Sequence, residues 1–232
     1  MNENITSPGK RLETCASFVR RGTVAADIGT DHAYLPIWLI QNGICPKVYA
    51  SDINDEPIRS AKRNIECLEL CDKIITFTGD GLQKIPQSDL GDIIIAGMGG
   101  DNIVSIINKA DWLRNRKYRL IMQPMSHTER LREYLYSHGY QIIAEKAICE
   151  SGRLYTIICA EYSDEKIQFT DFDIFAGKLD SNDPCAAALL KKQAGIIRSM
   201  AEGAAAKGNA QDAARYSSLA EKIIRYAEEK TK

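Results

Sequence analysis

Residues 25–35, ADIGTDHAYLP, place two acids and a histidine where an apolar run gives way to a turn. Turns that hold the phosphates of a dinucleotide usually contain several glycines, because the backbone must approach the ligand closely. This turn keeps only Gly29, and Asp31 would repel a pyrophosphate. Asp27 and Asp31 would instead attract a cation, such as the sulfonium and ammonium groups of S-adenosylmethionine. We therefore predict a site for S-adenosylmethionine rather than for a nicotinamide dinucleotide, while His32 could contact a substrate or cap the loop.

Three further loops follow later apolar runs and suit an adenosine derivative: SDIN (51–54), GDGL (79–82) and AGMGG (96–100). Asp52 lies 25 positions beyond Asp27 and is placed to accept hydrogen bonds from both ribose hydroxyls. A single acid after a strand is usually a helix cap or a turn residue. Four such loops together are a stronger signal, because ligands of open parallel sheets bind beyond the carboxyl ends of the strands.

Strands and helices alternate along the part of the chain that would position these loops. We expect strands at 23–29, 47–53, 73–80, 92–98 and 119–124, and helices at 8–21, 34–43, 55–70, 99–113 and 127–139. This alternation favours a parallel sheet with helices on both faces. Two more strands, 141–150 and 154–162, are too close in sequence for a crossover connection, so they must be antiparallel. A reversed final strand is typical of class I S-adenosylmethionine methyltransferases, and it favours them over a dehydrogenase.

Strand signals stop beyond residue 165 and helical spacing takes over. Apolar residues recur at helical intervals over 171–205 and again over 210–230, and KGN at 207–209 would turn the chain between the two runs. This pattern predicts an antiparallel helical hairpin or a short coiled coil. Residues 163–232 carry 11 basic and 11 acidic side chains, so a packing appendage fits this segment as well as an RNA-binding arm does.

The composition is ordinary for a soluble globular protein, with 44% hydrophobic and 26% charged residues. The formal net charge of −1 provides no bulk attraction to nucleic acid, so an RNA partner would need a local basic patch. We find neither a leader segment nor a window of about 18 apolar residues, and therefore expect a cytoplasmic protein without membrane contact. The length allows one domain with an appendage. We expect a cofactor-binding domain at 1–163 and a helical domain at 164–232.

The seven cysteines are odd in number, and their spacing matches neither a disulfide framework nor a zinc ribbon. Cys67 and Cys71 lie four apart on an expected helix, but a metal site needs further ligands and none lies near them. We therefore expect reduced cysteines and no metal ion.

The motifs ADIGTDHAYLP, SDIN, GDGL, IAGMGG and QPM, in this order and spacing, resemble the bacterial tRNA adenine-N1 methyltransferases of the TrmK family, which modify adenine 22 of tRNA. The resemblance covers residues 8–162 in detail and the helical C-terminal domain in outline. It implies a class I methyltransferase fold, S-adenosylmethionine as cofactor and tRNA as substrate. Two features depart from relatives: Met125 follows Gln-Pro where they tend to have Asn, and AGMGG occupies the place of the Asn-Pro-Pro-Tyr type motif of other adenine methyltransferases.

The resemblance and the positions of the loops together suggest roles. Asp27 and Gly29 would border the amino-acid end of the cofactor, Asp52 would bind the ribose, and Asp80 would lie at the adenine. The full set of expected cofactor contacts is Asp27, Ile28, Gly29, Thr30, Asp52, Ile53, Asn54, Gly79, Asp80, Gly81, Leu82, Gly97 and Met98. Adenine N1 already has a lone pair, so catalysis is mainly placement of the two reactants for an in-line displacement. Asp31 would stabilise the positive charge that develops on the product, and His32 is a second candidate.

The target adenine must leave its stack, because N1 lies on its Watson–Crick edge. Tyr34 is the nearest aromatic residue in sequence, although a tyrosine at a helix start more often packs on the core. The other expected substrate contacts are Gly99, Gly100, Gln123 and Pro124, and a basic cluster of Arg114, Arg116 and Lys117 that could equally be a solvated loop. Two alternatives stay open: a small-molecule methyltransferase with a helical oligomerisation arm, and an inert methyltransferase-like module that binds RNA or protein.

Overall fold

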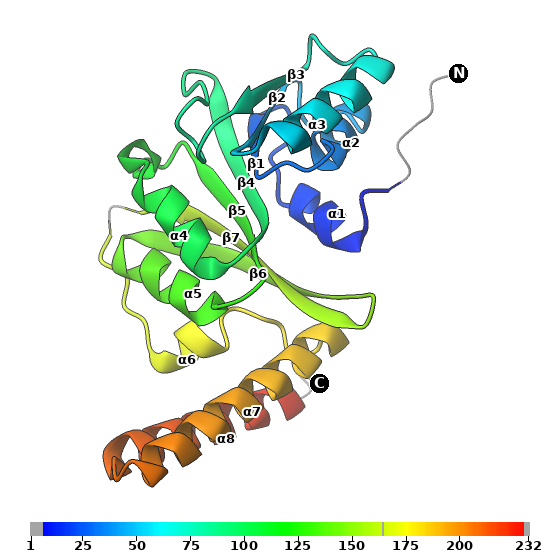
Figure 1. Ribbon diagram of the computed structural model, residues 1–232. Helices are drawn as coiled ribbons and strands as arrows, with labels where there is room; N and C mark the ends of the chain where they lie inside the picture. The colour runs from blue at the N-terminus through cyan, green and yellow to red at the C-terminus, as the bar shows by residue number, and fades with distance from the viewer. Residues whose placement is uncertain (1–6, 164, 230–232) are drawn as a thin grey trace.

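The computed structural model describes residues 7–163 and 165–229, and it contains one sheet with helices on both faces and a pair of long helices beside it (Figure 1). The sheet has seven strands in the order β3-β2-β1-β4-β5-β7-β6. The parallel strands are β1 (Val24–Ile28), β2 (Val48–Asp52), β3 (Ile74–Thr78), β4 (Leu90–Met98) and β5 (Arg119–Pro124). Strands β6 (Tyr140–Glu150) and β7 (Arg153–Tyr162) are antiparallel, and β7 also runs antiparallel to β5. The predicted fold, a mostly parallel sheet with a reversed terminal pair, is confirmed.

The connection between β6 and β7 is as tight as the sequence indicated. Ser151 and Gly152 form the turn with φ values of 50° and 72°, and Glu150 pairs directly with Arg153. Positive φ at both central residues matches the right-handed twist of the two strands, which is why this turn suits a two-residue hairpin.

Two apolar layers hold the helices on the sheet. Helices α1 (Lys10–Ser17), α2 (Tyr34–Gln41) and α3 (Asp55–Cys67) share one buried cluster, and α4 (Gly100–Asn108) and α5 (Thr128–Ser137) share the other. A short 3-10 turn, Asp111–Leu113, follows α4. Strand β1 pairs with both β2 and β4, so the strand order reverses there, and the loops after these strands lie where open sheets bind ligands.

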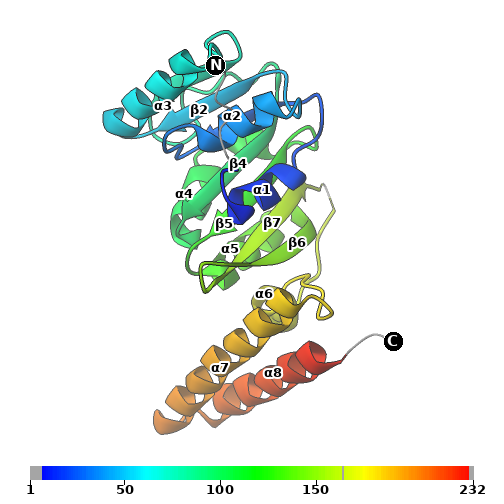
Figure 2. The same ribbon diagram turned by 90° about the vertical axis from the view of Figure 1, so that its right-hand side faces the viewer.

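The C-terminal segment forms helices α6 (Asp171–Phe175), α7 (Pro184–Ala206) and α8 (Ala210–Glu228). The helical run expected over 171–205 is broken, because Gly177 turns the chain at a φ of 67° and α7 begins only at Pro184, capped by Asp183. The predicted hairpin is confirmed: α7 and α8 lie side by side and share a buried seam (Figure 2). In both views the hairpin is at the opposite end of the molecule from α2 and α3. No helix in the described ranges is long and apolar enough to span a bilayer.

A buried ion pair ties the start of the helical segment to the sheet. Arg132 on α5 donates Nε to Glu145 Oε1 at 2.9 Å and Nη2 to Glu145 Oε2 at 3.0 Å, and both side chains are almost completely buried. Arg132 also donates to the carbonyl oxygen of Ile174, and the backbone N–H of Lys178 donates to Glu145. These bonds anchor the segment that follows α6, and a side chain at Gly177 would collide with the pair.

The structure also joins Cys149, at the end of β6, to Cys185, in the first turn of α7, by a disulfide. The expectation that all cysteines are reduced is therefore wrong for this pair, while the other five are free. The two residues are 36 positions apart and meet only through the tertiary fold, with a Cα to Cα distance of 5.7 Å, so sequence spacing could not reveal them. Helix α3 ends at Cys67, which leaves Cys71 outside it, and both thiols are exposed.

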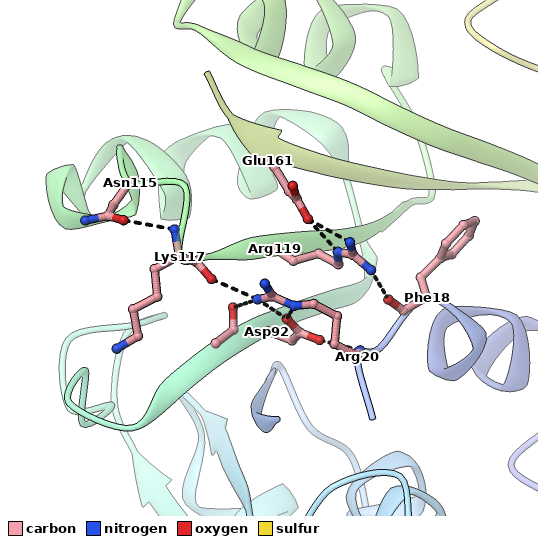
Figure 3. A network of polar contacts seen from close by, with 8 residues as sticks. Phe18, Arg20, Asp92, Asn115, Lys117, Arg119 and Glu161 are labelled. Carbon is pink, nitrogen blue, oxygen red and sulfur yellow. Dashed lines mark hydrogen bonds and ion pairs between the residues drawn. The ribbon is translucent and has the colours of Figure 1, made fainter. Parts of the chain in front are cut away.

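A polar network closes the amino-terminal end of β4 and β5 (Figure 3). Arg20 Nε donates to the buried Asp92 at 2.7 Å, and Arg119 Nε donates to Glu161 at 2.8 Å. Arg119 also donates to the carbonyl oxygen of Phe18, just after α1. The network fixes the connection between α1 and β1 against β4, β5 and β7. It lies at the amino-terminal ends of β4 and β5, away from the ligand-binding loops at their carboxyl ends.

Candidate functional site

The loops after β1, β2, β3 and β4 surround one cleft at the carboxyl ends of the strands. Its volume is about 480 Å³. Eight of the expected cofactor contacts line it, namely Ile28, Gly29, Asp52, Ile53, Gly79, Asp80, Gly81 and Met98. The topology thus brings together the loops that the sequence indicated.

The first loop is held against β2 by its backbone. The N–H groups of Gly29 and Thr30 both donate to the carbonyl oxygen of Ser51, at 2.8 Å and 2.9 Å. Gly29 has a φ of 78°, and a Cβ there would lie 2.1 Å from Met98 Cε. The backbone conformation therefore favours glycine at this position, and a larger residue would also displace the end of the Met98 side chain.

Asp27 is the buried acid of the site, only 7% exposed. Burial raises its pKa to about 6, while the Thr30 hydroxyl and the Arg11 guanidinium oppose the rise. Although Thr30 lies beside this carboxyl, its buried Oγ1 makes no hydrogen bond of normal geometry to any residue in the described ranges. A buried carboxyl and an unpartnered hydroxyl in one loop fit a ligand with a cationic, hydrogen-bonding end.

The second and third loops present two more carboxylates to the cleft. Asp52 Oδ1 accepts the N–H of Asn54 at 2.7 Å, which leaves its second oxygen for another donor. Asp80 pairs with Lys109 at 2.6 Å. Four further residues of the cleft were not expected from the sequence: Asn102, Ser105 and Ile106 on α4, and Lys109 just after it. Their helical spacing marks one face of α4, but only the fold shows that this face borders the cleft.

Asp31 and His32 lie on the rim of the site. The Asp31 side chain is 74% exposed, and His32 Nε2 lies 3.2 Å from its carboxylate. His32 has a φ of 54°, and its carbonyl oxygen accepts a hydrogen bond from Asn64 on α3, so the loop is fixed from outside the cleft. The His32 ring stacks on Tyr34, with 5.3 Å between ring centroids. Tyr34 is 42% exposed, so the expectation that it packs on the core is wrong.

The loop after β4 is tied to the turn after β5. Met125 donates its N–H to the carbonyl oxygen of Met98, and Gly100 donates to that of Ser126, each at 2.8 Å. A Cβ on Gly100 would lie 2.4 Å from the carbonyl oxygen of His127, so no larger residue fits there. The expected substrate contacts Gly99 and Gly100, at the start of α4, thus lie near Gln123 and Pro124, at the end of β5, although the Gln123 side chain is fully buried.

The basic cluster is not brought to the cleft. Arg114, Arg116 and Lys117 precede β5, and the cleft lies at the other end of that strand. Lys117 Nζ donates to the carbonyl oxygens of Gln87 and Ser88, both at 3.0 Å. A contact between this cluster and RNA stays a prediction.

Comparison with known proteins gives consistent similarities. The methyltransferase domain family matches residues 9–158. The chain is 39% identical to the tRNA (adenine(22)-N(1))-methyltransferase of Bacillus subtilis over 170 residues, which are 73% of this chain and 71% of that protein. The crystal structure of a putative tRNA (m1A22) methyltransferase from Streptococcus pneumoniae matches with a TM-score of 0.83 and 30% identity, covering 94% of this chain and all of that one. M. capricolum TrmK in complex with S-adenosylhomocysteine matches with a TM-score of 0.79 and 26% identity, covering 94% and 98%.

Proposed function

Because this chain belongs to the methyltransferase domain family and, within it, to the tRNA (adenine(22)-N1)-methyltransferases, we propose that it transfers a methyl group from S-adenosylmethionine to N1 of adenine 22 in tRNA. The observation that best supports this function is the cleft at the strand-order reversal, which is lined by Asp52 and Asp80, together with the buried Asp27 directly behind the Ile28–Gly29 segment of its wall. Relatives bound to S-adenosylmethionine or its demethylated product support the same cofactor.

The residues of the cleft fit this cofactor. Asp27 and Thr30 would take its amino-acid end, since one is anionic when deprotonated and the other has a free hydroxyl. Asp52 would accept the ribose hydroxyls, and Asp80 with Gly81 and Leu82 would frame the adenine. S-adenosylmethionine supplies the methyl group when bound.

The protein's contribution to the reaction is placement of the adenine and stabilisation of charge. The stacked His32–Tyr34 pair offers a flat, exposed surface at the rim on which an extruded base can stack. Asp31, exposed beside it, is placed to stabilise the cationic product. Gly99, Gly100 and Pro124 would line the target base, and Arg114, Arg116 and Lys117 would contact tRNA phosphates away from the cleft.

We also propose the two-domain division at 1–163 and 164–232, with the boundary at a residue outside the described ranges. The separate core shared by α7 and α8 supports it. The substrate would place the enzyme in the cytoplasm.

Methylation of unmodified tRNA tests the proposed function. Reverse transcription across tRNA treated with enzyme and cofactor should stop one nucleotide before adenine 22, and tRNA with guanine at position 22 should show no such stop. A stop at another adenine would reassign the target. Transfer to small amines but not to tRNA would favour the small-molecule alternative, and failure to bind S-adenosylmethionine at millimolar concentration would leave only the inert binding module.

A further inference from the structure

Arg11, on the first helix of the chain, reaches the end of β5 beside the loop that follows β4. Its Nη1 donates to Gln123 Oε1 at 2.6 Å, and the same oxygen accepts the backbone N–H of Gly97 at 3.1 Å. Gln123 is fully buried at the end of β5, and its Nε2 donates to the carbonyl oxygen of Pro124 at 2.9 Å. Both ends of the Gln123 amide therefore have partners inside the protein.

The amide of a glutamine has one accepting and one donating end, and a flip would exchange them. Arg11 can only donate, so it fixes the oxygen of Gln123 toward itself and toward Gly97. In the flipped orientation the amide nitrogen would face two donors and the amide oxygen would face the carbonyl oxygen of Pro124, so all three hydrogen bonds would be lost. The orientation that Arg11 selects holds Gly97, whose φ of 80° places it at the bend into the Met98–Gly100 loop.

Arg11 is itself held in place from two other strands. Its backbone N–H donates to Glu150 Oε1 at the end of β6, at 3.2 Å. Its guanidinium carbon lies 5.9 Å from the centre of the Tyr155 ring on β7. Among the described residues, its Nε and Nη2 have no hydrogen-bond partner, so the guanidinium group is held by hydrogen bonding through Nη1 alone and keeps donors for further hydrogen bonds.

The guanidinium also acts on the buried acid of the cofactor cleft. Among the described residues, the charged and titratable groups that interact electrostatically with Asp27 are Arg11 and Cys15 from α1 and Asp52 from the end of β2, and the Thr30 hydroxyl from its own loop lies beside it. Arg11 is the only cation among them, and it favours the ionised carboxylate, whereas burial and Asp52 oppose ionisation.

We propose that Arg11 is a positioning residue for methyl transfer: it fixes the Gln123 amide and, through it, the Gly97 loop against which the target adenine is placed. This inference rests on the proposed function for its kinetic test. Gln123 then acts by holding the loop rather than by touching the base.

A double-mutant cycle on Arg11→Met and Gln123→Ala tests the proposal. Each single change should lower kcat by about 10- to 100-fold, the scale expected when reactants are misplaced by about 1 Å. The double variant should be no slower than the slower single variant, because Arg11 acts through Gln123. Lys10→Met, which removes an exposed charge from the same helix, is the matched control and should keep wild-type kcat. Multiplying effects in the double variant, or wild-type kcat in Arg11→Met, would overturn the proposal.

A direct phosphate contact by Arg11 would give a different pattern. It would raise KM for tRNA with kcat unchanged, and the defect would grow with salt, which also overturns a positioning role. Arg11→Lys repeats the cycle if the methionine variant does not fold, since lysine keeps the charge without the planar fork.

A binding measurement separates this proposal from the proposed function. In Arg11→Met the loss of binding of S-adenosylhomocysteine at low pH should begin at a higher pH than in the wild type, and Arg11→Lys should restore it. An unchanged profile would contradict the electrostatic effect of Arg11 on Asp27. Absence of methylation at adenine 22 by the wild type would instead refute the proposed function, whatever the Arg11 variants do.

Discussion

Cofactor binding should depend on pH through Asp27. Burial raises the pKa of this carboxyl from its usual value near 3.8 to about 6 in the ligand-free protein. A cationic ammonium group binds the carboxylate and not the neutral acid, so binding must remove the proton. S-adenosylhomocysteine is the suitable probe, because it retains the ammonium and transfers nothing.

The size of the effect follows from this pKa. The dissociation constant should be constant above about pH 7 and should rise about tenfold at pH 5, because a group with a pKa of about 6 is then about 90% protonated. Binding should release about 0.9 protons at pH 5 and about 0.1 at pH 7. Isothermal titration calorimetry in buffers of different ionisation enthalpy measures both the affinity and the proton count.

Protonation of Asp27 should also affect the free energy of unfolding. The folded protein favours the protonated acid, so this contribution to the free energy of unfolding is complete below about pH 3.8 and is lost as the pH rises through about 6. Two units of pKa correspond to about 3 kcal/mol. Asp27→Asn should remove both effects, whereas Asp31→Asn, on the exposed rim, should retain them. A dissociation constant that does not change between pH 5 and 7.5 in the wild type, or the same change in Asp27→Asn, would refute this assignment.

Three further predictions concern other parts of the molecule. Asp52→Ala should raise the dissociation constant of the cofactor by about 10- to 100-fold, since it loses charge-assisted hydrogen bonds, while Asp31→Ala should mainly lower kcat; an equal loss of affinity in both would show that Asp31 binds the cofactor. Gly177→Ala should lower the free energy of unfolding, measured by chemical denaturation, by about 3 kcal/mol or more, because the new Cβ would lie 2.1 Å from Glu145 Oε2 and disturb the buried ion pair with Arg132. Wild-type stability in this variant would show that the chain relaxes around the added methyl group. Reduction of the Cys149–Cys185 disulfide should lower the thermal midpoint of the helical segment by several degrees, because the bond closes a loop across 36 positions and contributes about 3–4 kcal/mol by the chain-entropy model. Cys185→Ser should have the same midpoint as the reduced protein. An unchanged midpoint would show that α7 stays in place without the bond.

The parts of this fold that sequence patterns predicted are those with local causes. A strand buried on both faces is a continuous apolar run, and the acid at its end is adjacent in sequence, so Asp27 and Asp52 could be placed at the carboxyl ends of β1 and β2 without a structure. The reversed strand pair followed from the two residues between Glu150 and Arg153, because so short a connection permits only one geometry. The break after α6 was not predicted, because the helical spacing of apolar residues continues across Gly177 although the helix itself ends before this residue.

The unpredicted side-chain contacts join residues that are distant in the chain. Asp80 and Lys109 are separated by 29 positions, Cys149 and Cys185 by 36, and Arg11 and Gln123 by 112. No periodicity or motif relates such pairs, since neither partner carries a local signal of the other. Their meeting depends on strand order and on which face of a helix turns inward.

Residues that the sequence motifs identify and residues that only the fold brings to the site also have different roles. Asp27 has the right type and position for a cation from its sequence alone, but in the fold it is so deeply buried that it would hold a proton to about pH 6. Arg11 from the first helix favours the ionised form of Asp27 and also donates a hydrogen bond to the Gln123 amide at the end of β5. If Arg11 affects both the ionisation of Asp27 and the orientation of the Gln123 amide, variants of Arg11 should change cofactor binding and placement of the target base together.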